Sequence, residues 1–443
     1  MPTSQQDSIA HQPQTIPASP DFLTEAQALG EELREFRRLL HRHPELGNDL
    51  PWTQAQVLTQ LEGLGLEITT GTSLSSVTAV LRGLAAPTTS PAHNLPESTP
   101  ERSSGSTAPA DPTPQRPAVL LRADMDALPV REESGEDFAS DNGAMHACGH
   151  DLHTAGLIGA ARLLAAHRET LAGDVVLMFQ PGEENPGGAK PMIDEGVLDA
   201  AGPRVQAAFG FHVHPGTLGS IQYRPGTYMA GVYILRITVH GVGGHSSQPH
   251  HARNPLPAAV EIAAGLQTAV HQTFPGTEPV VATLTQLHVG GPAPNIITDE
   301  AVLGGSVRVM NREVARRFGA MVEQLAAGTA AAHGCTATVD FTELYPATIC
   351  DPTEAEFAAD TLRSLLGEDK VTRNAHSRMG SEDFSYVLDQ VPGAFLHVGA
   401  TYEGLDPETT ASNHSARARF DDSVLPVMSA GLARLAYDRL QRG

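Results

Sequence analysis

The spacing of apolar residues predicts alternating helices and strands over the first half of the chain. The segment from Phe22 to Arg42 has leucines at helical spacing, with acidic residues early and basic residues late, as the helix dipole prefers. Further helices are predicted over residues 52–64 and 154–164, and strands over residues 77–82, 118–122, 171–180 and 208–214. This alternation is typical of an α/β domain with a mostly parallel sheet.

A different order of elements follows between residues 229 and 341. The pattern predicts strands over residues 231–239, 279–289, 301–310 and 335–343, and helices over residues 255–274 and 313–333. A β-α-β-β-α-β order is typical of a ferredoxin-like α+β unit. We therefore expect residues 229–341 to form a small domain inserted into a larger one of residues 23–228 and 342–443. Two domains also suit a chain of 443 residues, which exceeds the size of one ordinary core.

Two polar segments interrupt this pattern. Residues 1–22 are expected to form a disordered tail, and residues 1–20 are polar, without the apolar stretch of a signal peptide. Residues 86–117 are rich in Pro, Ser and Thr and cannot bury a core, so we expect a disordered insertion at a hairpin tip, with no catalytic role. No stretch is long and apolar enough to span a bilayer, which predicts a cytoplasmic protein.

The net charge argues against some kinds of partner, and the cysteine content argues against a disulfide-rich fold. The net charge of −22, with no block rich in Lys or Arg to offset it, argues against nucleic acid or an anionic membrane as partner. The three cysteines, Cys148, Cys335 and Cys350, are too sparse to form a disulfide framework.

Half of a metal site is indicated by the segment from Met145 to His153. Cys148 and His150 are two residues apart, so both side chains can point the same way, and a thiolate with an imidazole favours zinc or a neighbouring transition metal. An inert buried cysteine would leave the clustering of His146, Asp151 and His153 unexplained. The segment opens the helix predicted from residue 154.

Candidates for the second half of the metal site follow further along the chain. Glu183 and Glu184 lie on the turn after a predicted buried strand, where one could bind a metal and the other could take a proton from the attacking water. Most Glu pairs are solvated surface residues, so both interpretations stay open for this pair alone. His212 and His214 share one face of an apolar strand, and His414 by itself would be taken for a surface histidine.

Seven short motifs occur in one order along the chain. They are His-Pro-Glu-Leu-Gly (43–47), Leu-Arg-Ala-Asp-Met-Asp-Ala-Leu-Pro (121–129), Met-His-Ala-Cys-Gly-His-Asp (145–151), Gln-Pro-Gly-Glu-Glu (180–184), Gly-Gly-His-Ser-Ser (243–247), Met-Gly-Ser-Glu-Asp-Phe (379–384) and Asn-His-Ser (413–415). In this order the chain resembles the amidohydrolase branch of the di-metal aminoacylase/carboxypeptidase family, which includes hippurate hydrolases, auxin-conjugate hydrolases and N-acyl-amino-acid deacylases. The resemblance runs from about Leu33 to the C-terminus, with Gly182 where Ala is commoner.

The resemblance implies a metallopeptidase-type catalytic domain with two divalent metal ions, zinc or manganese, and Glu183 as general base. Its implied metal ligands are Cys148, which would bridge the ions, His150, Glu184, His212 and His414. Asp124, Asp126 and Asp151 would orient the imidazole ligands, although capping of a strand end stays open for the first two. His43 and Glu382 belong to the motifs and are expected to be structural.

The inserted domain would act as a lid and dimerisation domain. The resemblance implies that His245 stabilises the oxyanion, in many relatives within the partner subunit's site. The strands of this domain can pair edge to edge, which predicts a homodimer, or an oligomer built from dimers, through the lid domain. Asn295 and Arg308 match lid residues that hold the substrate carboxylate, which a guanidinium can grip with two parallel hydrogen bonds. A plain surface charge remains the alternative for Arg308.

These residues together predict a hydrolase that cleaves N-acyl-L-amino acids to a carboxylic acid and a free amino acid. A metallo-dipeptidase or carboxypeptidase would use the same centre with a different acyl pocket. A non-catalytic binding protein on this fold would lack Glu183, which is present. A cysteine-nucleophile hydrolase would use Cys148 with a histidine, and its activity would survive metal chelation.

Overall fold

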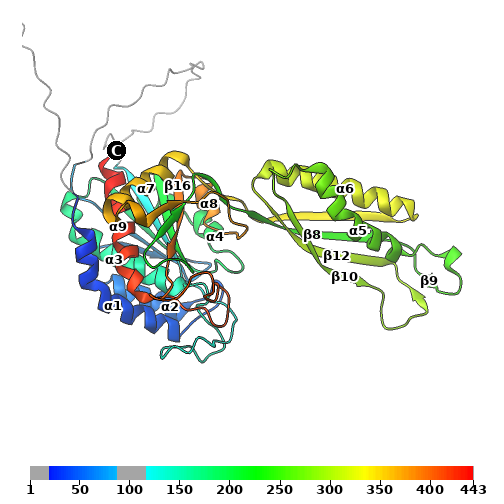
Figure 1. Ribbon diagram of the computed structural model, residues 1–443, viewed down its shortest axis with the longest axis horizontal. Coiled ribbons are helices and arrows are strands. Elements are labelled where there is room, and N and C mark those ends of the chain that lie inside the picture. The colour runs from blue at the N-terminus through cyan, green and yellow to red at the C-terminus, as the bar shows by residue number, and fades with distance from the viewer. Residues whose placement is uncertain (1–18, 87–115, 443) are drawn as a thin grey trace, which may run out of the picture.

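The chain folds into two bodies, a larger main domain and an elongated lid domain that projects from it (Figure 1). The computed structural model describes residues 19–86 and 116–442. Across these residues, no helix combines the length and the apolar character needed to cross a bilayer.

An eight-stranded sheet in the order β1-β2-β4-β3-β5-β16-β6-β15 forms the centre of the main domain. Its strands are β1 Glu67–Thr70, β2 Val77–Leu81, β3 Ala118–Asp124, β4 Asp174–Gln180, β5 Ala207–His214, β6 Ile221–Tyr223, β15 Val371–Arg373 and β16 Gly393–Gly399. The central pairs β4–β3, β3–β5 and β5–β16 are parallel. Every residue of β3, β4 and β16 is buried, as expected for strands covered on both faces. The predicted α/β domain with a mostly parallel sheet is confirmed.

The expectation that the Pro-rich insertion lies at a hairpin tip is wrong. Strand β2 pairs antiparallel with β4, while β3 pairs parallel with β4 on its other edge. The two strands that flank the insertion are therefore separated by β4 and form no hairpin. Of the predicted insertion, residues 87–115 lie outside the described chain.

Three helices of the main domain pack on one another: α1 Phe22–Arg42, α3 His150–Ala166 and α9 Leu425–Gln441. Helix α1 starts where the Asp21 carboxylate accepts a hydrogen bond from the Thr24 amide at 3.2 Å. Phe22 is fully buried, so the tail predicted for residues 1–22 ends before it, and residues 1–18 lie outside the described chain. The shorter helices of the main domain are α2 Pro51–Leu61, α4 Ala189–Asp194, α7 Pro352–Leu366 and α8 Ser385–Leu388, with 3-10 turns at Arg168–Thr170, Val197–Asp199, Glu368–Lys370 and Asp422–Val424. A 3-10 turn at Pro249–His251 belongs to the lid domain.

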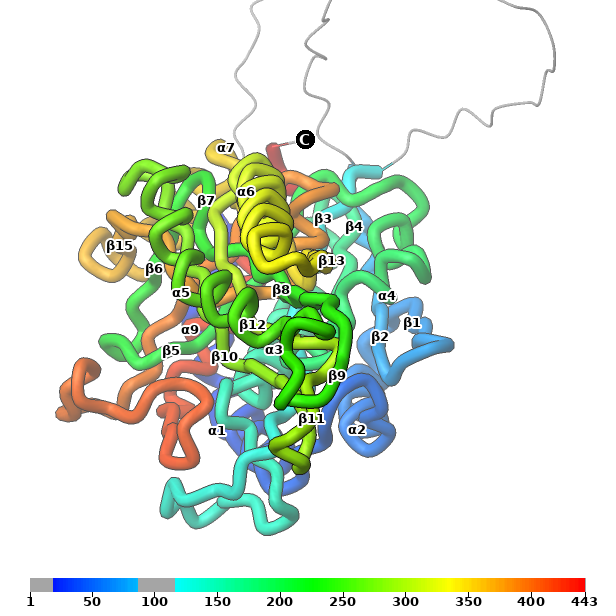
Figure 2. Tube along the Cα trace, turned by 90° about the vertical axis from the view of Figure 1, so that its right-hand side faces the viewer, coloured from blue at the N-terminus to red at the C-terminus, as the bar shows by residue number. Residues whose placement is uncertain are grey.

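The lid domain has the predicted ferredoxin-like order. Its elements are β8 Gly231–His240, α5 Pro255–Thr273, β10 Val281–Val289, β12 Glu300–Val309, α6 Arg312–Ala332 and β13 Thr336–Tyr345. The strands form an antiparallel sheet in the order β10-β12-β8-β13, and both helices pack into a separate core with it. A small ribbon of β9 Gly244–His245 and β11 Ile296–Ile297 forms the tip, farthest from the main domain in Figure 1 and toward the viewer in Figure 2.

Two neighbouring chain crossings join the lid to the main domain. Strand β7 Gly226–Met229 leads into β8, and β14 Thr348–Cys350 follows β13, and these two strands pair antiparallel. The chains approach closely here, because a Cβ at Gly231 would lie 2.8 Å from the Ala347 nitrogen. The carboxyl ends of β4 and β5 open toward this junction, where loops after parallel strands usually form binding sites.

Candidate metal centre

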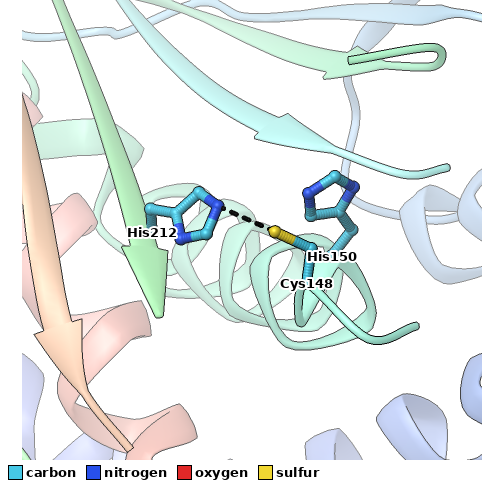
Figure 3. Close-up of side chains that lie close together, drawn as sticks. All are labelled: Cys148, His150 and His212. Carbon is cyan, nitrogen blue, oxygen red and sulfur yellow. Dashed lines mark hydrogen bonds between the residues drawn. The ribbon is translucent and has the colours of Figure 1, made fainter. Parts of the chain in front are cut away.

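Four separate segments bring the five predicted metal ligands together. Cys148 and His150 lie at the start of α3, and His212 reaches them from β5, so that the thiol stands between two imidazoles (Figure 3). The Cys148 Sγ is 3.3 Å from the His212 Nε2. Glu184, after β4, places its Oε1 2.9 Å from the Nε2 of His414, in the loop before α9.

The ligand atoms form two overlapping groups that share the thiol. Cys148, His150 and His212 have ligand atoms within 4.8 Å of one another, and so do Cys148, Glu184 and His414. One sulfur atom common to two groups is the arrangement that a bridging thiolate requires.

The polar atoms of these groups fit a divalent transition-metal ion. His150 is fully buried, yet within the described chain neither of its ring nitrogens makes a hydrogen bond of good geometry. Its nearest carboxylate oxygens are the Asp126 Oδ1 at 3.4 Å and the Asp124 Oδ2 at 3.6 Å. Burial raises the pKa of the Cys148 thiol to about 12 in the absence of a metal ion. A bound cation would reverse this shift because it stabilises the thiolate.

The electrostatic environments of the adjacent glutamates differ. Burial favours the neutral form of Glu184, but the hydrogen bond with His414 and the charge of His150 outweigh it and lower the pKa. For Glu183, burial and the negative charges of Glu382, Glu184 and Asp383 outweigh the charge of His150 and raise the pKa well above the ordinary value. A carboxylate with a raised pKa suits a general base, while an ionised one suits a metal ligand.

Asp124 and Asp126 lie next to the proposed ligands, near His150 and the backbone of the two glutamates. The Asp126 carboxylate accepts hydrogen bonds from the backbone amides of Glu183 at 2.9 Å and Glu184 at 3.0 Å. Asp124 accepts a hydrogen bond from the His153 Nδ1 at 2.6 Å, and the His153 Nε2 accepts one from the Val213 amide at 2.8 Å. His153 therefore connects Asp124, through these two hydrogen bonds, to the strand that carries His212.

Asp151 occupies a different position from the predicted one. Its Oδ2 lies 2.7 Å from the Arg37 Nε and 2.7 Å from the His41 Nδ1, both on α1. Among the described residues its hydrogen bonds run to α1 rather than to a predicted ligand. We therefore assign Asp151 to anchoring α3 against α1, because its two close polar contacts are both with residues of α1.

The three lid residues predicted to act on the substrate, His245, Asn295 and Arg308, lie at two different places. Arg308, near the end of β12, lines the same cavity as Cys148 and Glu183, and its Nη1 donates to the Met379 carbonyl at 3.1 Å and the Ser381 Oγ at 3.0 Å. His245 lies at the tip, where it pairs with Ile296 beside Asn295. The strand from residue 300 to residue 308 alone spans about 27 Å. Asn295 and Arg308 of one chain therefore do not converge on one carboxylate.

A cavity of about 390 Å³ lies over the ligands at the junction of the two domains. Besides the predicted residues it is lined by Met229, Val232, Leu344, Tyr345, Gly380, Ser381, Glu382, His397 and Asn413. Several of these have polar side chains to which the motifs assigned no role.

For three of these polar residues, the sequence differed in how clearly it indicated a place near the site. Asn413 precedes His414 in a quoted motif, and its Nδ2 donates to the carbonyls of Cys148 at 3.3 Å and Val213 at 3.1 Å. His397 lies beside His212 in the parallel pair of β16 and β5, and a histidine in an apolar strand was its only signal. Glu382, expected to be structural, is buried and forms an ion pair with Arg122 at 2.8 Å.

Comparison with known proteins assigns the chain to a family. The sequence model of the family described as Peptidase family M20/M25/M40 matches residues 120–438. IAA-amino acid hydrolase ILR1-like 4 from Arabidopsis thaliana is 33% identical over 88% of this chain and 82% of its own length. Thermostable carboxypeptidase 2 from Saccharolobus solfataricus is 32% identical over 91% of this chain and 94% of its own. N-acetylcysteine deacetylase from Bacillus subtilis is 32% identical over 93% of this chain and 97% of its own.

A solved structure agrees with this assignment. The YXEP protein of Bacillus subtilis, described as a dinuclear metal binding peptidase from the M20 family, superposes with a TM-score of 0.74 at 30% identity. The superposition covers 94% of this chain and 99% of that one. The chain described here thus belongs to peptidase family M20/M25/M40 and is a hydrolytic enzyme.

Proposed function

We propose that the protein uses two divalent metal ions to hydrolyse the amide bond of N-acyl-L-amino acids. The observation that carries the proposal is that the two thiol-sharing ligand groups lie together, and that Cys148, Glu184, His212 and His414 of these groups line one cavity with the buried carboxylate of Glu183 and the guanidinium of Arg308. Cys148, His150, Glu184, His212 and His414 would hold the metals, for which zinc and manganese are the candidates.

The residues of the cavity suggest how the reaction divides among them. When bound, the metal ions would polarise the amide carbonyl and acidify the attacking water. Glu183 would accept the proton of that water and pass it to the leaving amine. Arg308 would exchange its present hydrogen bonds to Met379 and Ser381 for the substrate carboxylate, which orients the scissile amide.

Names of relatives support an acylated amino acid as substrate. One relative is an N-acetylcysteine deacetylase and another an IAA-amino acid hydrolase. The second candidate, a dipeptidase or carboxypeptidase, is supported by the relative named thermostable carboxypeptidase 2. Both candidates place an amino acid carboxylate on Arg308, and they differ in the group on the other side of the amide.

The lid supports a homodimer in which two chains complete each site. His245 and Asn295 are exposed at the tip together with Ile296, whose side chain is 64% exposed. In the proposed dimer these two polar residues enter the partner's cavity, where His245 would stabilise the oxyanion and Asn295 the substrate carboxylate.

The proposed domain limits are residues 229–341 for the lid, with the remainder from residue 23 in the main domain. A thiolate ligand also suits a cytoplasmic location.

A substrate panel tests this function. The metal-free protein is reloaded with zinc or with manganese and assayed on N-acetyl amino acids, N-benzoyl amino acids and dipeptides. We expect kcat/KM to be highest for an N-acyl amino acid and to fall to background in Glu183→Gln. Dipeptides with a free amino group as the best substrates would support the peptidase instead, and full activity in the presence of a chelator would refute both.

A further inference from the structure

We propose that Tyr345 is a positioning residue for the hydrolysis, because it fixes the peptide that carries Glu183. The inference rests on the proposed function, in which Glu183 is the general base. The Tyr345 hydroxyl donates a hydrogen bond to the Glu183 carbonyl oxygen at 2.8 Å. Tyr345 is only 7% exposed and lines the cavity above the metal ligands.

The backbone of Glu183 is held from two sides. The Asp126 carboxylate accepts the amide hydrogen of Glu183 at 2.9 Å, and the Tyr345 hydroxyl donates to its carbonyl oxygen. Rotation of either flanking peptide would leave a buried polar group without its partner, which is unfavourable because the group would lose a hydrogen bond without gaining one to water. The side chain of the base therefore starts from a fixed point, as an oriented proton transfer requires.

A β-bulge brings Tyr345 to this place. Glu343 pairs with Tyr233 and Tyr345 pairs with Val232, so Leu344 is an extra residue in β13. The bulge leaves Leu344 42% exposed and directs the next side chain into the cavity wall.

The ring of Tyr345 fills a space that the glutamate loop leaves open. A Cβ at Gly187, where φ is 100°, would lie 3.2 Å from the Tyr345 Cε1. The ring also meets Tyr386 edge to face, with centroids 6.2 Å apart and planes at 81°. Tyr345 is the last residue of the strand that returns from the lid, so its hydrogen bond ties the position of the base to that of the lid.

Two single-hydroxyl deletions in the same junction test the inference. Tyr345→Phe removes the bond to Glu183, whereas the matched control Tyr386→Phe removes a similar bond, from the Tyr386 hydroxyl to the Leu344 carbonyl at 2.7 Å. Both variants and the wild type are loaded with the same metal. Their kcat, KM, metal content and melting temperature are then compared on the best amide substrate of the wild type.

A positioning role predicts a selective loss of turnover. We expect Tyr345→Phe to lower kcat about tenfold or more, with KM within about threefold and metal content unchanged, while Tyr386→Phe keeps the wild-type kcat. Any of four results would overturn this inference while leaving the proposed function intact. They are a normal kcat in Tyr345→Phe, a loss of metal from it, a rise in its KM without a fall in kcat, or an equal fall in kcat in both variants. A loaded wild type that cleaves no amide would overturn the proposed function as well.

Discussion

Replacing Asp126 with asparagine should weaken metal binding without unfolding the protein. The Asp126 carboxylate accepts two backbone N–H groups, one from the proposed base at 2.9 Å and one from the proposed ligand Glu184 at 3.0 Å. An asparagine has one acceptor oxygen, so its amide nitrogen would face the second N–H. The Glu184 peptide would then have to move or leave a buried donor unpaired.

The size of the effect follows from these two hydrogen bonds. A buried hydrogen bond to a charged group contributes about 1.5–3 kcal/mol, and Asp126→Asn removes one of them and the charge from the other. If this free energy is lost mainly from the metal-bound state, the metal Kd rises about 10- to 100-fold, since each 1.4 kcal/mol is a factor of ten. An effect of this size is usual for groups that orient metal ligands.

Asp151→Asn is a suitable control, because it neutralises another buried carboxylate close to His150 in the sequence. Its contacts run to Arg37 and His41 of α1, so we expect a lower melting temperature but a Kd within about threefold of wild type for the folded protein. The Kd is measured by competition with a chelating dye, and folding by circular dichroism. A larger effect on Kd from Asp151→Asn than from Asp126→Asn would refute the assignment of both residues.

Four further predictions test other parts of the site and the fold. Glu183→Gln should lose most of kcat and keep its metal by elemental analysis, whereas Glu184→Gln should lose metal; equal metal loss in both would contradict the division of roles. Cys148→Ser should lose metal occupancy and activity together, and alkylation of Cys148 in the wild type should require a chelator, since a liganded thiolate is protected. His245→Ala and Glu183→Gln, each nearly inactive, should regain up to about a quarter of wild-type activity when refolded together, unless His245 acts within its own chain. Burial disfavours ionised Glu132, but its hydrogen bonds to His41 and Ser134 lower its pKa from 4.5 to about 2. The stability it contributes is therefore present above about pH 4.5 and is lost as the pH falls toward 2, so Glu132→Gln should flatten that part of the plot of melting temperature against pH.

Local sequence determined the elements of this fold and the identity of the candidate ligands. The apolar stripe of α1 and the apolar run from Val175 to Phe179 in β4 follow from local patterns, which a short window of sequence contains. The ferredoxin-like order of the lid could be predicted for the same reason. The candidate ligands were recognisable because thiol, imidazole and carboxylate groups are seldom clustered without a chemical use, and because their motifs keep the order of a known family.

Contacts between distant segments were decided only by the tertiary structure. Arg122 forms buried ion pairs with Glu382 at 2.8 Å and Asp383 at 3.1 Å, and no local pattern indicates that these residues meet. The same holds for the pairing of β2 with β4, the anchoring of Asp151 to α1 and the hydrogen bond from Tyr345 to Glu183. Each depends on how finished elements pack, which is set by the burial and hydrogen-bonding needs of the whole core rather than by the period of one segment.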